Sequence, residues 1–164
     1  SPAVNQVVVA GTTSATYFAF KMTSQNEVQK VPSLKITATG ANALAMGTLK
    51  NIKLYENSAT APFASAAQFD ACGANSCWVT FIASDNLLSA PVPMTGTTIY
   101  ARADVDGGGE VTLGNDFVFR IASANDVIAK GANTNTVSIV TGTPSATGIS
   151  YIVPQKVKLK LFRH

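Results

Sequence analysis

The sequence predicts an all-β protein, folded as a single antiparallel β-sandwich of about nine or ten strands. Two observations predict this class. Hydrophobic and polar residues alternate along many short segments, and clusters of Gly, Pro, Ser, Thr and Asn separate these segments. No segment shows a convincing helical period. With 164 residues, no internal repeat and no linker, the chain is expected to form one domain over residues 1–164.

Alternation marks the strands in chain order, and each is expected to bury one face in an immunoglobulin-like or jelly-roll-like sandwich. ANALAMGTLK, residues 41–50, is expected to form at most one helical turn. The expected strands lie in VNQVVVAG at residues 4–11, around Leu34, Ile36 and Ala38, around Ile52 and Leu54, around Val79 and Phe81, over residues 99–105 and 117–121, and around Val157, Leu159 and Leu161.

The composition favours an extracellular protein. Charged residues are 13% of the chain, against about 25% in soluble domains, so Ser, Thr, Asn and Gly must cover the surface. The net charge is +3, and four basic residues lie in the last nine positions. Either they form a solvated strand face, which we favour, or they attract an anionic cell-wall polymer. The sequence has no cluster of basic residues interleaved with aromatic ones, so nucleic-acid binding is not predicted.

The cysteines and the chain start point to the same location. Cys72 and Cys77, in ACGANSCW, are expected to form a disulfide, which requires an oxidising compartment. A zinc half-site is the alternative, but the chain has one histidine, His164. The sequence contains no run of 18 apolar residues, so no membrane-spanning segment is predicted. SPAVNQ is interpreted as what remains after removal of a signal peptide. We therefore expect an extracellular, cell-surface protein.

The two ends of the chain are expected to be edge strands. VNQVVVAG is apolar and β-branched, and KVKLKLF at residues 156–162 is amphipathic. In one interpretation both complete their own sheets. In the other, residues 1–10 form an exchanged donor strand that completes a neighbouring subunit and builds a polymer. The residues expected to insert are Val4, Val7, Val8 and Val9, whereas the lysine-bearing strand is expected to stay in its own sheet.

Four segments together resemble a β-sandwich module of secreted surface proteins in candidate-phyla (Patescibacteria-type) bacteria. They are TYFAFKMTSQNEVQKVPSLKITATG, LKNIKLYEN, TTIYARADVDGGG and FVFRIASANDVIAKGA, within residues 15–132. The resemblance implies S-layer-like or adhesin-like proteins, often with the module repeated, whereas this chain has one copy. It implies no catalytic residues.

The stretch ARADVDGGGEVTLGND, residues 101–116, holds four of the nine acidic residues. Its start is like an EF-hand loop, but the twelfth position is Asn115, where a bidentate Glu is required. A glycine-rich turn at residues 106–109 between two strands is the plainer interpretation. The alternative is a calcium site of another kind, and no other cofactor is expected. Its ligands would be Asp104, Asp106, Glu110 and Asp116.

Catalysis is not predicted. No acidic pair is distinguished by its surroundings, the histidine is terminal, and no glycine-rich loop opens a helix. Trp78 directly follows Cys77, which favours core packing, with an exposed sugar-stacking platform as the alternative.

The sequence thus predicts an extracellular structural protein that self-assembles into a filament or layer by strand complementation. Its partner would be itself, with cell-wall polymer or glycan as further candidates. A monomeric adhesin or carbohydrate-binding module, with or without calcium, is the alternative function.

Overall fold

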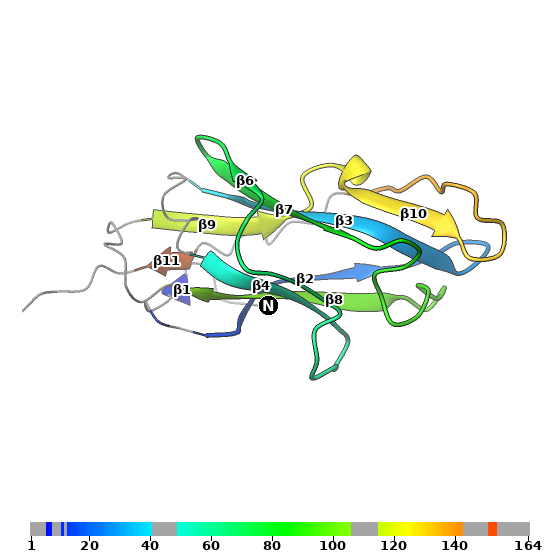
Figure 1. Ribbon diagram of the computed structural model, residues 1–164, viewed down its shortest axis with the longest axis horizontal. Helices are drawn as coiled ribbons and strands as arrows, with labels where there is room; N and C mark the ends of the chain where they lie inside the picture. The colour runs from blue at the N-terminus through cyan, green and yellow to red at the C-terminus, as the bar shows by residue number, and fades with distance from the viewer. Residues whose placement is uncertain are drawn as a thin grey trace, which may run out of the picture.

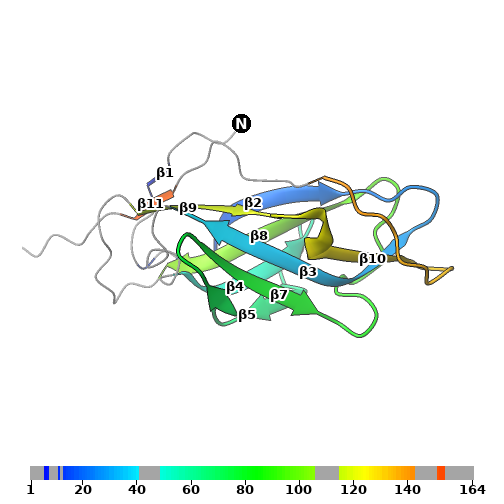
Figure 2. The same ribbon diagram turned by 90° about the horizontal axis from the view of Figure 1, so that it is seen from above.

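The computed structural model describes residues 6–7, 11, 13–40, 49–105, 115–142 and 151–153. These residues form two β-sheets that face each other across an apolar core (Figures 1 and 2). The helical structure of this part of the chain is one short turn, η1 (Ala124–Asp126). The predicted all-β class and two-sheet sandwich are confirmed.

The strands are short and follow one another in chain order. They are β1 (Gln6–Val7), β2 (Ala15–Met22), β3 (Gln29–Thr39), β4 (Leu49–Glu56), β5 (Ala64–Ala66), β6 (Ala71–Cys72), β7 (Ser76–Ile82), β8 (Thr97–Val105), β9 (Asn115–Arg120), β10 (Val127–Gly131) and β11 (Tyr151–Val153).

The larger sheet has seven strands in the order β1-β11-β9-β3-β7-β6, with β10 also paired to β3, and the smaller sheet has the order β2-β8-β4-β5. Paired strands are antiparallel, except that β1 runs parallel to β11. Because β7 occupies one side of β3, β9 and β10 must share the other side. They pair with residues 37–39 and 29–34 of β3, and η1 lies between them.

The core follows the predicted alternation most closely in β8, where every second residue from Thr97 to Val105 is buried. Its aromatic centre joins the two sheets. The ring centroid of Tyr17 on β2 lies 5.2 Å from that of Phe117 and 5.9 Å from that of Phe119, both on β9. Fully burying one such side chain contributes about 1.5–3 kcal/mol.

Two sequence expectations fall outside this description. Residues 41–48, where one helical turn is predicted, and the amphipathic segment 156–162 lie outside the described residues. The turn η1 was not predicted. It begins with a capping box, in which the Ser123 hydroxyl accepts from the Asn125 N–H and the Asp126 carboxylate accepts from the Ser123 N–H.

Candidate functional site

Cys72 and Cys77 form a disulfide, which confirms the sequence prediction. The two residues lie opposite each other in the hairpin of β6 and β7. The turn between them is closed by the Gly73 N–H, which donates to the Ser76 carbonyl oxygen at 2.7 Å. The bond fits an oxidising compartment and is compatible with an extracellular protein.

Trp78 does not pack in the core, so that prediction was wrong. Cys77 and Val79 are buried, and alternation along β7 therefore turns Trp78 to the outer face of the larger sheet, where it is half-buried. The Lys35 ammonium lies 5.4 Å from the centroid of the indole ring. The disulfide next to Trp78 fixes the hairpin, whereas the strand period decides which face the ring occupies.

Asp104 lies on β8 and binds two neighbouring strand segments. Its carboxylate accepts from the Ser14 N–H at 2.6 Å and from the Asn51 side-chain amide at 2.8 Å. The hydrogen bond from Asn51 is the main cause that lowers the pKa of Asp104, followed by the Ser14 N–H and the charge of Lys53. Asp104 thus ties β8 to β4 and to the residue before β2.

The predicted calcium site remains a prediction. Asp106 and Glu110 lie outside the described residues, and only the backbone of Asp116 is described, in β9. Across the described part of the chain, no three His, Cys, Asp or Glu side chains are grouped so that they would hold a metal ion.

The predicted donor residues are described only at Val7, since Val4, Val8 and Val9 lie outside the described residues. Val7 belongs to β1, which pairs with β11 through two residues, Gln6 opposite Tyr151 and Val7 opposite Ile152. Among the described strands, β1 is an edge strand of the larger sheet, as is β6 at the other end of the order. Donor-strand exchange by residues 1–10 therefore stays a prediction.

A groove of about 640 Å³ opens on the side of the sandwich where β2 faces β10. We call this side the open flank, defined by the end of β2, the following loop at residues 23–27, β10, and residues 134–142. Its apolar floor consists of nearly fully buried side chains. They are Phe20, Val31, Val92 and Ile121.

The wall opposite β2 is a strand-like segment that continues the larger sheet beyond β10. The Ser138 N–H donates to the Ala129 carbonyl oxygen at 2.9 Å, and the Gly131 N–H donates to the Thr136 carbonyl oxygen at 3.0 Å. The apolar side chains of this segment are strongly exposed, Val137 at 65% and Ile139 at 94%. This wall therefore presents hydrophobic residues at the mouth of the groove.

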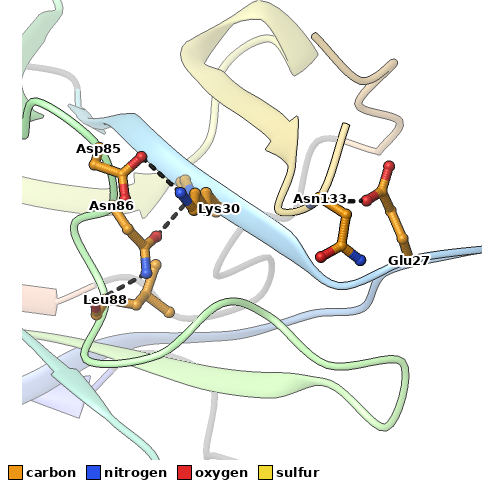
Figure 3. Close-up of polar contacts among 7 residues, drawn as sticks. Glu27, Lys30, Asp85, Asn86, Leu88 and Asn133 are labelled. Atoms are coloured by element: carbon orange, nitrogen blue, oxygen red, sulfur yellow. Dashed lines mark hydrogen bonds and ion pairs between the residues drawn. The ribbon is translucent and has the colours of Figure 1, made fainter. Parts of the chain in front are cut away.

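Glu27 holds this wall in place from the β2–β3 loop (Figure 3). Its carboxylate accepts from the Thr134 hydroxyl at 2.7 Å and from the Asn133 N–H at 3.1 Å. These two hydrogen bonds, that of Thr134 first, lower the pKa of Glu27. Gly131 leaves the space for the contact, because a Cβ there would collide with the carboxylate and with Thr134.

Ser24 is the one residue of the described groove lining whose buried side-chain oxygen has no hydrogen-bond partner. The residue is 7% exposed. A buried hydroxyl without a partner costs about 1–3 kcal/mol, so such a group is expected to have a function or an unseen partner. The open flank therefore combines an apolar floor with an unused hydrogen-bonding group.

The opposite side of the sandwich, between β5 and β7, has a shallower hollow of about 450 Å³. We call it the closed flank, because polar side chains already satisfy its backbone. The Asp70 carboxylate accepts from the Thr80 N–H of β7 at 2.7 Å, directly before β6 begins. The Asp70 carboxylate thereby takes the place of the backbone carbonyl that a longer β6 would offer to β7.

Asn86 closes the same flank next to β3 (Figure 3). Its side-chain oxygen accepts from the Val31 N–H at 2.8 Å, and its amide donates to the Leu88 carbonyl oxygen at 3.0 Å. An ion pair of 2.9 Å between Lys30 and Asp85 lies beside it. Side-chain caps of this kind protect a sheet edge from pairing with another chain.

Sequence reasoning missed the open flank. Residues 136–140, TVSIV, alternate as an edge segment does, but no strand was predicted there. Ser24 gives no sequence signal, because burial by distant residues makes it unusual.

No family model matches the chain, and neither a curated protein nor a solved structure is significantly similar to it. Among the described residues, no helical segment has the length and hydrophobicity that a membrane crossing requires.

Proposed function

We propose that this protein is an extracellular structural subunit that self-assembles into a cell-surface filament or layer by strand complementation. The observation that carries the proposal is the weak attachment of β1, an outermost strand that the described structure holds through a two-residue parallel ladder. Parallel pairing is slightly less stable per residue than antiparallel pairing. The segment around β1, PAVNQVVVA at residues 2–10, is uncharged and β-branched, and so is suited to enter another sandwich.

Strand complementation has a direct physical rationale. A donor strand gains backbone hydrogen bonds along the edge of the acceptor sheet, and its alternate side chains bury apolar surface in the acceptor. Because donor and acceptor surfaces differ, each subunit keeps one of each, and the contact repeats into an open polymer. The low charge of the chain, 13%, is consistent with a surface that is covered by neighbouring subunits.

The test is negative-stain electron microscopy with multi-angle light scattering of the full chain over a rising concentration series, with and without a chelator. We expect concentration-dependent oligomers that become filaments or sheets, and their loss when residues 1–10 are deleted. Dissolution by the chelator would assign a calcium role to the acidic stretch at residues 104–116. Monodisperse monomers at every concentration would contradict the proposal.

A second function, a carbohydrate-binding or adhesin module, is favoured by the position of Trp78 outside the core. An indole on the outer face of a sheet can stack on a sugar ring. Lys35 lies on the neighbouring strand β3, and Arg120 lies on β9, one strand further across the same sheet. Quenching or enhancement of Trp78 fluorescence by soluble cell-wall glycans, saturating with concentration, would support this function. An unchanged spectrum across a glycan panel would count against it.

A further inference from the structure

The open flank is built like one side of a sandwich from which a strand is missing. On one wall, β2 is an edge of the smaller sheet within the described residues. On the other wall, residues 136–138 extend the larger sheet. The floor between these walls is apolar and buried. An extended segment placed here would contact both walls and cover the exposed side chains of Val137 and Ile139.

Ser24 adds a polar requirement to this apolar site. Its buried hydroxyl oxygen accepts a hydrogen bond from no described residue. An extended chain presents a carbonyl oxygen at every residue and an N–H at every residue except proline, so it supplies a partner once the lining shifts to expose the hydroxyl, which is closed to solvent in this structure. A purely apolar ligand would leave Ser24 unsatisfied. The site therefore fits a peptide backbone with small apolar side chains.

The charge of the lining separates the two candidate donor segments. Among the lining residues only Lys21 and Glu27 are charged, so the groove is formally neutral. PAVNQVVVA at residues 2–10 is uncharged, whereas KVKLKLF at residues 156–162 carries three lysines. The neutral groove matches the amino-terminal segment.

The positions of the strands favour a segment from another molecule over the chain's own amino terminus. β1 and β11 lie at one end of the sandwich, at the left of Figure 1, whereas β10 and the segment that follows it lie at the other end. Pairing with β11 places Val7 at that first end of its own chain, so this two-residue pairing must break before the segment enters a groove. A segment that leaves from one end and a groove that opens near the other end produce head-to-tail contacts.

We infer that the groove of the open flank is the acceptor site for residues 4–9 of a second copy of this chain, whose apolar side chains enter the groove and whose backbone bonds to Ser24. This inference rests on the proposed function. It specifies the acceptor, which that function alone does not.

Disulfide trapping between two full-length variants tests the inference. One carries Val7→Cys, and the other carries Ile139→Cys at the mouth of the groove. The matched control for the second is Ile82→Cys, since Ile82 is also an exposed isoleucine, at 75%, but lies on the closed flank. We expect roughly tenfold more cross-linked heterodimer with Ile139→Cys than with Ile82→Cys, because pairing holds the two thiols at high effective concentration.

Light scattering of the same mixtures separates the possible failures. Assembly without preferential trapping at Ile139→Cys would overturn the acceptor assignment and leave the proposed function standing. Preferential trapping of Leu159→Cys at the groove would assign it to the carboxyl-terminal segment and likewise overturn the inference. An internal disulfide in a monomeric Val7→Cys/Ile139→Cys double variant would assign the groove to the chain's own amino terminus. Absence of any assembly would count against both proposals.

Discussion

The open and closed flanks occupy opposite sides of the same sandwich, but they treat their sheet edges differently. On the closed flank, the side chains of Asp70 and Asn86 accept hydrogen bonds from backbone N–H groups that have no partner on a neighbouring strand. On the open flank, the Ser24 hydroxyl has no partner and Ile139 is 94% exposed. Natural sandwiches protect edges that must not pair. The proposed acceptor site rests on this contrast between an unprotected edge and a protected one.

The largest loss of stability is expected when a side-chain cap of the closed flank is removed. Asn86→Ala leaves the Val31 N–H and the Leu88 carbonyl oxygen without their partner, so the free energy of unfolding should fall by roughly 2–3 kcal/mol. Urea unfolding followed by circular dichroism measures this loss. Asn125→Ala, in the exposed turn η1, is the matched control and should stay within about 0.5 kcal/mol of the parent. Equal stability of the two variants would show that Asn86 does not close the flank.

The disulfide is expected to contribute slightly less. Cys72→Ala/Cys77→Ala removes a cross-link that restricts a six-residue loop in the unfolded chain, worth about 2 kcal/mol on the chain-entropy account. A midpoint drop of roughly 4–8 °C in thermal unfolding is expected for a chain of this size. Reduced parent protein should show the same drop. An unchanged midpoint would mean that β6 and β7 hold together without the bond.

A smaller effect concerns pH and the wall of the open flank. The pKa of Glu27 is lowered in the folded protein by Thr134 and Asn133. A lowered folded pKa stabilises the protein at pH values above the unfolded pKa, and this contribution disappears as the pH falls through the folded pKa. The unfolding midpoint of the parent should therefore fall more steeply than that of Glu27→Gln between about pH 5 and pH 3.

A suitable control for this pH series is Asp85→Asn, which removes an exposed carboxylate on the closed flank. It should leave the contribution of Glu27 to the pH dependence intact. Parallel profiles of the parent and Glu27→Gln would contradict the role assigned to the two hydrogen bonds.

The smallest stability effect is expected at Ser24. Because its hydroxyl is buried without a partner, Ser24→Ala should raise the free energy of unfolding by about 1 kcal/mol, the lower end of the cost of leaving that group unsatisfied. Ser138→Ala is the matched control and should lose about 1 kcal/mol, since the Ser138 hydroxyl donates to Gln29. In assembly, Ser24→Ala should weaken subunit affinity roughly fivefold, the equivalent of one hydrogen bond. A loss of folding stability with unchanged assembly would reverse this interpretation.

The sequence predicted several parts of the fold because they depend on local period. The alternation from Thr97 to Val105 appears unchanged in β8, and the short spacing of Cys72 and Cys77 predicted their bond. The same alternation along β7 places Trp78 on the outer face. The prediction instead followed the neighbouring disulfide and assigned the ring to the core, which was wrong. Local patterns were reliable where period two was followed strictly and failed where a fold analogy replaced it.

The candidate site was not predictable in the same way. Ser24, Val31, Val92 and Ile121 meet in one groove although about a hundred residues separate the first from the last. No local pattern specifies which strand edges face each other across a sandwich. Only the segment expected to enter the groove, Val4 to Val9, was recognisable from its composition.

By itself, the sequence determined the all-β class, the positions of β3, β4, β7, β8 and β9, and the disulfide, because side-chain alternation and loop spacing are properties of neighbours along the chain. The tertiary structure alone decided that Asp70 and Asn86 cap one flank while the other keeps a buried, unpartnered hydroxyl. Hydrogen-bond satisfaction and burial depend on residues that are distant in sequence, and these contacts exist only once the two sheets have packed together.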